Sequence, residues 1–327
     1  MTKLDLAIPL INGCGTGSYV DNFLALERAG ACFGAYAIKS VGPCSNNHLL
    51  REKYGWQKEK TGNPNPTVVY TGSVVLNSMA LPTHPIESWI EELENTELKT
   101  PIIGSVWGNK PRDYGLLIEK IDPYVVAHQV NISCPNKQAG EKSVMETMTM
   151  QTLESIVLVA RAVTQKPLMV KLSPNEDYVA IAKLVAKYVD YFICGNTVGP
   201  GLVIDIDSRR PFLAGNYGGM SGPAMKPKIM KMVNDVYEVV KGSDVKIVAS
   251  GGIQDSGDII EYAIAGASMF EIGTCAFMKL NPDGTARGRT TEEIAELTNN
   301  IWHGVKGFLS KEKTTLDELI GSMVKNG

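Results

Sequence analysis

Short apolar, β-branched runs alternate along the chain with stretches that have helical spacing. Eight of these runs predict strands, over residues 34–39, 73–77, 101–105, 124–131, 167–171, 190–196, 245–250 and 268–273. Continuous apolar runs are typical of strands buried on both faces of a parallel sheet. Most intervals between them carry apolar residues three and four positions apart, as in residues 87–93, 178–189 and 257–266. Eight such units favour a (β/α)8 TIM barrel over a doubly wound sheet.

Two intervals are longer than a simple connection needs. The segment between Lys39 and Ser73 and the segment between Asn196 and Val245 are rich in Gly, Pro and Asn. In a barrel, oversized loops that follow strands build the catalytic face. No repeat, low-complexity segment or linker interrupts the pattern, so we expect one domain over residues 1–327, with long βα loops over the C-terminal mouth.

Every predicted strand ends in a polar residue or a glycine. These ends are Lys39, Asn77, Ser105, Asn131, Lys171, Asn196, Ser250 to Gly252, and Gly273 to Thr274. Strands often end in polar residues simply because turns begin there. In a barrel, however, these positions converge on one mouth, where active sites lie.

Two features of these ends suggest a particular ligand. The glycines after the seventh and eighth strands can bring backbone N–H groups close to a phosphate, although tight turns have the same composition. An unpaired ammonium is costly to bury, so Lys39 and Lys171 at the ends of apolar strands suggest a cofactor whose ring system gains negative charge. A reduced flavin fits this requirement.

The most specific motif is Asn131-Ile-Ser-Cys-Pro-Asn136. Its thiol, Cys134, follows a strand end and lies between two amides, so it is a candidate general base or nucleophile, or else an inert buried cysteine. We expect the cysteines that lie in apolar runs to be structural; these are Cys14, Cys32, Cys194 and Cys275. The four histidines have no metal-binding spacing, so no metal site is predicted, and the pair Asp205 and Asp207 is typical of solvated loop charges.

Composition and charge narrow the class of protein. The 327 residues carry 32 basic and 35 acidic side chains, and this balance excludes a strongly basic nucleic-acid binder. No run approaches the length of a membrane span, and the first residues lack the apolar stretch of a signal peptide. The six cysteines contain no CxxC pair, so we expect a reduced, cytoplasmic protein; any iron–sulfur relay must come from another chain.

Together the motifs resemble a known family. Asn131 to Asn136, Met169-Val-Lys-Leu-Ser-Pro174, Gly218-Gly-Met-Ser-Gly-Pro-Ala-Met-Lys-Pro227, Ser250-Gly-Gly252 and Ile272-Gly-Thr274 appear in the order found in the class 1 (soluble, FMN-dependent) dihydroorotate dehydrogenases. The similarity begins near Pro9 and covers nearly the whole chain. It implies an FMN-containing barrel that oxidises (S)-dihydroorotate to orotate in de novo pyrimidine (UMP) biosynthesis.

The resemblance also implies roles for individual residues. Cys134 would be the base that takes the C5 proton while hydride passes from C6 to flavin N5, and Lys39 would assist at the same site. The residues implied to hold the pyrimidine are Lys39, Asn77, Met79, Leu81, Asn131, Asn136, Asn196 and Thr197. The residues implied to line FMN are Gly15, Lys39, Ser40, Ser105, Asn131, Lys171 (beside N1 and O2), Gly222, Gly251, Gly252, Gly273 and Thr274.

The motifs leave the partner and the oxidant open. Asn77-Ser-Met79 resembles the fumarate-using homodimeric type, whereas the Cys134 motif and residues 218–224 resemble the NAD-linked type, which pairs with an iron–sulfur flavoprotein electron-transfer subunit. We therefore expect a homodimer, with a heterotetramer containing that subunit as the alternative, and leave fumarate, NAD and quinone open as acceptors. Ala80 stands where the family usually has glycine. A dihydropyrimidine dehydrogenase-like enzyme and a non-catalytic phosphate-binding barrel are the alternative functions.

Overall fold

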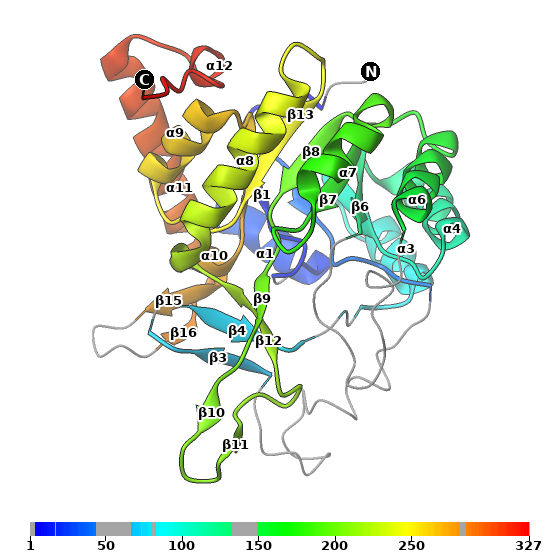
Figure 1. Cartoon of the computed structure of the whole chain (residues 1–327), viewed down its shortest axis with the longest axis vertical. Coiled ribbons are helices and arrows are strands. Elements are labelled where there is room, and N and C mark those ends of the chain that lie inside the picture. Colours follow the sequence, from blue (N-terminus) through cyan, green and yellow to red (C-terminus); the bar gives the residue numbers. More distant parts are fainter. Residues whose placement is uncertain are drawn as a thin grey trace.

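In the computed structural model, parallel strands form an eight-stranded barrel (Figure 1). The structure describes residues 4–16, 18–43, 67–72, 74–79, 81, 83–132, 149–280 and 286–326. The barrel strands are β1 (Leu10–Asn12), β2 (Tyr36–Ala37), β5 (Ile102–Val106), β6 (Ala127–Asn131), β7 (Leu168–Leu172), β8 (Tyr191–Cys194), β13 (Lys246–Ser250) and β14 (Met269–Ile272). They pair in the order β1-β14-β13-β8-β7-β6-β5-β2, and a parallel bridge between Ile11 and Ala35 nearly closes the ring. The predicted TIM barrel is thus confirmed.

One predicted barrel strand is wrong and another was missed. The run at residues 73–77 contains β4 (Val75–Asn77), which pairs antiparallel with β3 (Val68–Tyr70) and β12 (Gly218–Ser221) outside the barrel. Its place in the ring is taken by the three-residue strand β1. A short apolar run has the same local strand propensity in either sheet, and the choice between sheets depends on packing partners that are distant in sequence.

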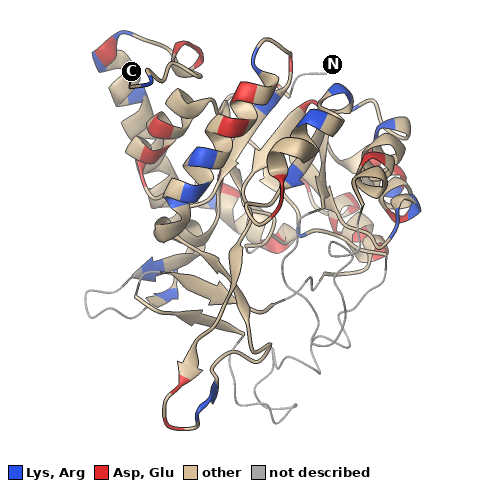
Figure 2. Cartoon of the chain, viewed as in Figure 1, with Lys and Arg blue, Asp and Glu red and all other residues tan. Residues whose placement is uncertain are grey.

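The helices cover the outside of the barrel (Figure 1). They are α1 (Val20–Arg28), α3 (Ile86–Glu94), α4 (Pro111–Ile121), α6 (Met150–Ala162), α7 (Tyr178–Val185), α8 (Lys226–Val240), α9 (Ser256–Ala265), α10 (Thr274–Phe277), α11 (Thr291–Glu312) and α12 (Leu316–Leu319), with 3-10 turns at Asp122–Tyr124, Ala186–Tyr188 and Pro223–Met225. Capping boxes begin α9 at Asp255 and α11 at Thr290. Charged side chains of both signs are interspersed along these outer helices (Figure 2). Among the described helices, none is both long enough and apolar enough to cross a bilayer.

The long loops build a layer beyond the C-terminal ends of the strands, as predicted. There β3, β4, β12 and β9 (Val198–Gly201) form an antiparallel sheet, and β10 (Ile204–Asp205) with β11 (Arg210–Pro211) extends from it (Figure 1). A second hairpin joins β15 (Met278–Leu280) to β16 (Ala286–Gly288). The Asp205 carboxylate accepts the backbone N–H groups of Asp207 and Ser208, so it organises a turn.

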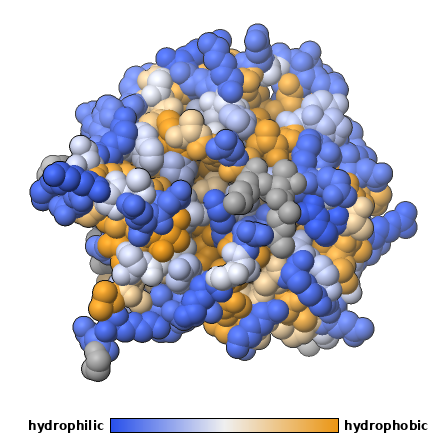
Figure 3. All heavy atoms as spheres, turned by 90° about the horizontal axis from the view of Figure 1, so that it is seen from above, coloured by the Kyte–Doolittle hydropathy of each residue, from blue (hydrophilic) through white to orange (hydrophobic). Residues whose placement is uncertain are grey.

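The barrel interior has its own apolar core. Its buried residues are Ile11, Cys14, Ala35, Ala37, Ile103, Ala127, Met169, Tyr191, Ile193, Val248 and Met269. Leu4 and Leu6 pack against this cluster, and the backbone N–H of Leu4 donates to the Tyr191 hydroxyl at 3.0 Å. The face of the molecule seen from above in Figure 3 has hydrophilic residues around its margin and hydrophobic residues in separate patches. A larger core fills the space between the barrel and the helices.

Candidate active site

The barrel interior becomes polar toward its C-terminal mouth, because the last inward-facing side chains of the strands are polar. Side chains two positions apart on a strand face the same side. Met169 belongs to the interior core, so Lys171 also faces inward, and Met269 places Glu271 inside in the same way. The same relation holds for Ile103 with Ser105, Ala127 with Gln129 and Asn131, and Val248 with Ser250. The apolar floor of the barrel is therefore capped by a layer of polar side chains.

Above this layer lies a cavity of about 370 Å³, within the range typical of small-molecule sites. The predicted site residues that line it are Gly15, Lys39, Ser40, Asn77, Met79, Leu81, Asn131, Lys171, Asn196, Thr197, Gly222, Gly251, Gly252, Gly273 and Thr274. Ser105 is not in the wall; it is buried behind Ser40, with the two hydroxyl oxygens 2.8 Å apart. Cys134 and Asn136 lie outside the described residues.

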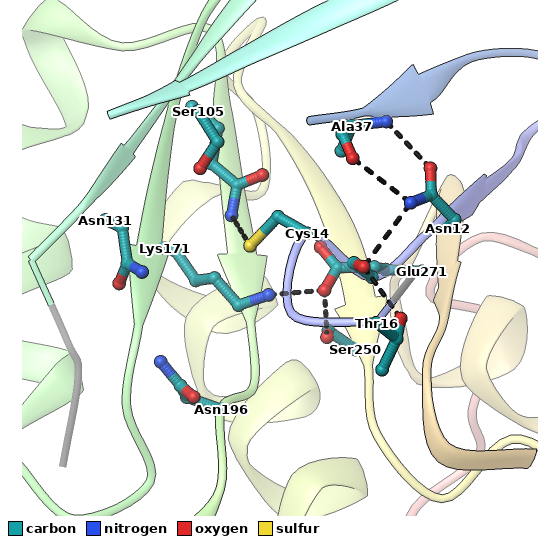
Figure 4. Close-up of polar contacts among 12 residues, drawn as sticks. Asn12, Cys14, Thr16, Ala37, Ser105, Asn131, Lys171, Asn196, Ser250 and Glu271 are labelled. Carbon is teal, nitrogen blue, oxygen red and sulfur yellow. Dashed lines mark hydrogen bonds and ion pairs between the residues drawn. The ribbon is translucent and has the colours of Figure 1, made fainter. Parts of the chain in front are cut away.

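A buried ion pair crosses the barrel interior at the base of the cavity. Lys171 is 5% exposed and Glu271 is 3% exposed, and the Lys171 Nζ contacts Glu271 Oε1 (Figure 4). The Ser250 hydroxyl donates to the same carboxylate oxygen at 2.9 Å. Burial lowers the pKa of the Lys171 ammonium, but the Glu271 carboxylate and the nearby Cys14 thiol raise it, and the net pKa lies above the usual lysine value. Lys171 therefore stays protonated at neutral pH.

Hydrogen bonds hold the amide side chains of the wall in place. The Asn131 Nδ2 group donates to Ser40 Oγ at 3.2 Å, and Asn77 Nδ2 donates to the Gly219 carbonyl at 3.3 Å. The backbone N–H of Thr197 donates to Asn196 Oδ1 at 2.8 Å. Figure 4 shows Asn131 on β6, Lys171 on β7 and Asn196 just after β8 approaching the same space. Such oriented amides suit a flat ring with alternating donors and acceptors.

The wall residues that were not predicted as functional include two cysteines and a buried carboxylate. Cys14, predicted to be structural, lines the cavity, where its sulfur accepts hydrogen bonds from Gln129 Nε2 and Ser40 Oγ. Glu271 also lines it. The signal for Glu271 was available, since a carboxylate inside an apolar strand is as costly to bury as the ammonium of Lys171. Cys275, also predicted to be structural, is a third wall residue.

The cavity fits a large cofactor with a flat ring and a phosphate. A Cβ atom added at Gly15 or Gly273 would meet no atom within 4 Å, because both glycines face the open space. Gly222, Gly251 and Gly252 have positive φ angles, which favour glycine and let the backbone approach a ligand closely. Apolar side chains also line the cavity; they include Met79, Leu81, Met220, Met225, Phe277 and Met278.

Buried polar atoms in the wall also lack partners. Thr197 Oγ1 and Glu271 Oε2 make no hydrogen bond within the described part of the chain. Such atoms are expected where a ligand completes the hydrogen bonding. In the described ranges, no three His, Cys, Asp or Glu side chains come together as a metal site. The fold and the cavity together define a barrel with a small-molecule site at its C-terminal mouth, whose glycines and buried lysine suit a phosphate-bearing cofactor.

Comparison with known proteins identifies the family. The sequence profile of the family described as dihydroorotate dehydrogenase matches residues 1–287. The chain therefore belongs to the dihydroorotate dehydrogenase family, whose members are FMN-dependent oxidoreductases of pyrimidine biosynthesis. The resemblance inferred from the motifs is thereby confirmed.

The relatives include catalytic subunits of the B type. The chain is 37% identical to the dihydroorotate dehydrogenase B (NAD+) catalytic subunit of Geotalea daltonii, over 99% of both chains. It is 37% identical to the subunit of the same name from Geobacter sulfurreducens, covering 90% of this chain and 93% of the relative. The subunit of the same name from Methanothermobacter thermautotrophicus is 31% identical, over 98% and 95%.

A solved structure supports the fold. The crystal structure of dihydroorotate dehydrogenase from Eimeria tenella, in complex with ferulenol, superposes with a TM-score of 0.70. The superposition covers 96% of this chain and 84% of the Eimeria tenella chain, at 18% sequence identity. At this identity the similarity concerns the barrel architecture.

Proposed function

We propose that this chain binds FMN and oxidises (S)-dihydroorotate to orotate, with the residue roles that the motifs imply. One observation carries the proposal: Lys39, the amides of Asn77, Asn131 and Asn196, and Thr197 line the same cavity as Lys171. The proposed cofactor-binding glycines line it too; they are Gly15, Gly222, Gly251, Gly252 and Gly273. The groups proposed to bind substrate and the groups proposed to bind the cofactor thus line one continuous cavity. FMN, when bound, supplies the acceptor for the hydride that leaves C6 of the substrate.

The side chains of the wall match the chemistry of the pyrimidine. Amides can both donate to carbonyl oxygens and accept from ring N–H groups, and a lysine pairs with a carboxylate. In this proposal Lys39 binds the carboxylate of dihydroorotate, and Asn77, Asn131 and Asn196 hold the ring so that one face lies against the cofactor. Cys134 takes the C5 proton, so that a proton and a hydride leave together and the C5–C6 double bond of orotate forms.

The test is an anaerobic titration of the FMN-loaded protein. Dihydroorotate is expected to bleach the yellow flavin absorbance stoichiometrically, whereas dihydrouracil, which lacks the carboxylate for Lys39, is expected to bleach it poorly. Equal bleaching by both compounds would favour a dihydropyrimidine dehydrogenase-like activity. A protein that carries no flavin would contradict the proposal.

Gly15→Val is expected to remove most of the bound FMN without unfolding the protein. The added side chain meets no protein atom near the Cβ position, so it extends into the space proposed for the cofactor. The measurement is the ratio of flavin absorbance to protein in the purified variant, together with its circular dichroism. Gly307→Val is the matched control, since a Cβ at Gly307 also meets nothing and that residue lies exposed on α11, outside the cavity. Retention of the normal FMN ratio by Gly15→Val would contradict the proposed cofactor position.

We further propose that the chain works with an electron-transfer subunit and uses NAD as the final oxidant. The support is the identity of 37% to relatives named as catalytic subunits of a B (NAD+) enzyme. The proposed partner is an iron–sulfur flavoprotein, assembled with a homodimer of this chain into a heterotetramer, in the cytoplasm. Addition of the partner subunit should confer NAD reduction by dihydroorotate, and fumarate turnover by the isolated chain would instead favour the homodimeric type.

A further inference from the structure

Lys171 forms a buried ion pair with Glu271, and the proposed function does not require this carboxylate. Lysine at this position is expected beside the N1 and O2 edge of the flavin, where a cation stabilises negative charge in the ring. In this chain the same ammonium contacts a carboxylate that is itself buried. The two opposite charges belong to strands β7 and β14, 100 positions apart in sequence.

The surroundings strengthen the interaction between these charges. The Ser250 hydroxyl donates to Glu271 Oε1, the oxygen that also contacts Lys171, and the other oxygen has no partner within the described residues. Both side chains nevertheless line the cavity, so each has an atom facing the proposed cofactor. Both side chains are almost fully buried, and electrostatic interactions between buried charges are weakly screened.

We propose that Glu271 tunes the flavin by partly neutralising the positive charge of Lys171, and that it holds the Lys171 ammonium in position. This inference rests on the proposed binding of FMN. Reduction places negative charge in the flavin ring, so a carboxylate behind the lysine makes reduction less favourable than the lysine alone would. A lowered potential suits delivery of electrons to a weak oxidant such as a nicotinamide. Glu271 is thus a positioning and tuning residue that acts through Lys171.

The experiment is Glu271→Gln in the FMN-loaded protein, with two readouts that are independent of dihydroorotate. Sulfite adds to flavin N5, and the negative charge that it brings into the ring is stabilised by nearby cations, so its affinity reports the local charge. The variant is expected to bind sulfite about tenfold more tightly or better than the wild type. The midpoint potential of the flavin is also expected to rise. Each tenfold change in the equilibrium constant of a two-electron reduction corresponds to about 30 mV.

Three further variants make the result decisive. Glu271→Met also removes the charge and should raise sulfite affinity in the same direction, so the inference remains testable should the amide variant fail to fold. Glu271→Asp keeps the charge and should stay within about threefold of the wild type. Glu238→Gln is the matched surface control. Glu238 forms an ion pair with Lys241, and it lies about 13 Å along α8 from Ile229, which is part of the cavity wall.

The outcomes separate this inference from the proposed function. FMN-loaded neutral variants whose sulfite affinity and potential equal those of the wild type would overturn the role of Glu271 and leave the proposed function intact. A tenfold rise in Glu271→Asp or in Glu238→Gln would also overturn it, since charge beside Lys171 would then not be the cause. Failure of the wild type to bind FMN would overturn both.

Discussion

Cys134→Ala is expected to leave a yellow, FMN-loaded protein whose flavin is bleached by dihydroorotate about 10² to 10⁴ times more slowly than in the wild type. That range is the usual contribution of a positioned general base. The variant has no group to take the C5 proton, although Lys39 and the wall amides still bind the substrate. The measurement is anaerobic stopped-flow absorbance at pH 7 with saturating dihydroorotate.

Two companion variants define the role of the thiol. Cys134→Ser should restore part of the rate only at higher pH, because a hydroxyl loses its proton much less readily than a thiol with its usual pKa near 8.5. Cys32→Ala is the control, since Cys32 is half-buried outside the cavity wall and burial raises the pKa of its thiol. Bleaching of Cys134→Ala within threefold of the wild-type rate would exclude Cys134 as the base.

Lys171→Met is expected to lower the free energy of unfolding by about 3–5 kcal/mol, the usual cost of leaving one charge of a buried pair without its partner. Glu271 is 3% exposed and, among the described residues, would keep only the hydrogen bond from Ser250. The pKa of Lys171 is raised in the folded protein, so the pair stabilises the fold below the ordinary lysine value of about 10.4 and loses this effect only as the pH rises through the raised pKa. Urea unfolding at pH 8 should therefore show the full difference.

The controls for this prediction separate burial from charge. Lys231→Met breaks an exposed pair with Asp235 on α8 and should cost about 0.5 kcal/mol or less. The double variant Lys171→Met/Glu271→Met removes both buried charges and should recover most of the lost stability. A loss of unfolding free energy below about 1 kcal/mol in Lys171→Met would contradict a buried ion pair between Lys171 and Glu271.

Much of the site could be predicted from residue types and their position at strand ends. Lys39, Asn131, Lys171 and Asn196 were identified because they end predicted strands, and strand ends converge on one mouth in a barrel; all four line the cavity. The glycines at positions 251, 252 and 273 were identified in the same way. Their individual roles toward FMN and substrate, and the single domain over residues 1–327, stay predictions.

The sequence by itself determined the class of fold and the set of polar groups available to the mouth, because strand period and side-chain chemistry are local properties. Only the tertiary structure decided that Leu10–Asn12 is a barrel strand and that Val75–Asn77 belongs to the separate antiparallel sheet. It also decided that Lys171 faces Glu271. Both results depend on contacts between segments far apart in the chain, and such contacts are selected by packing of the whole barrel rather than by the neighbours of each residue.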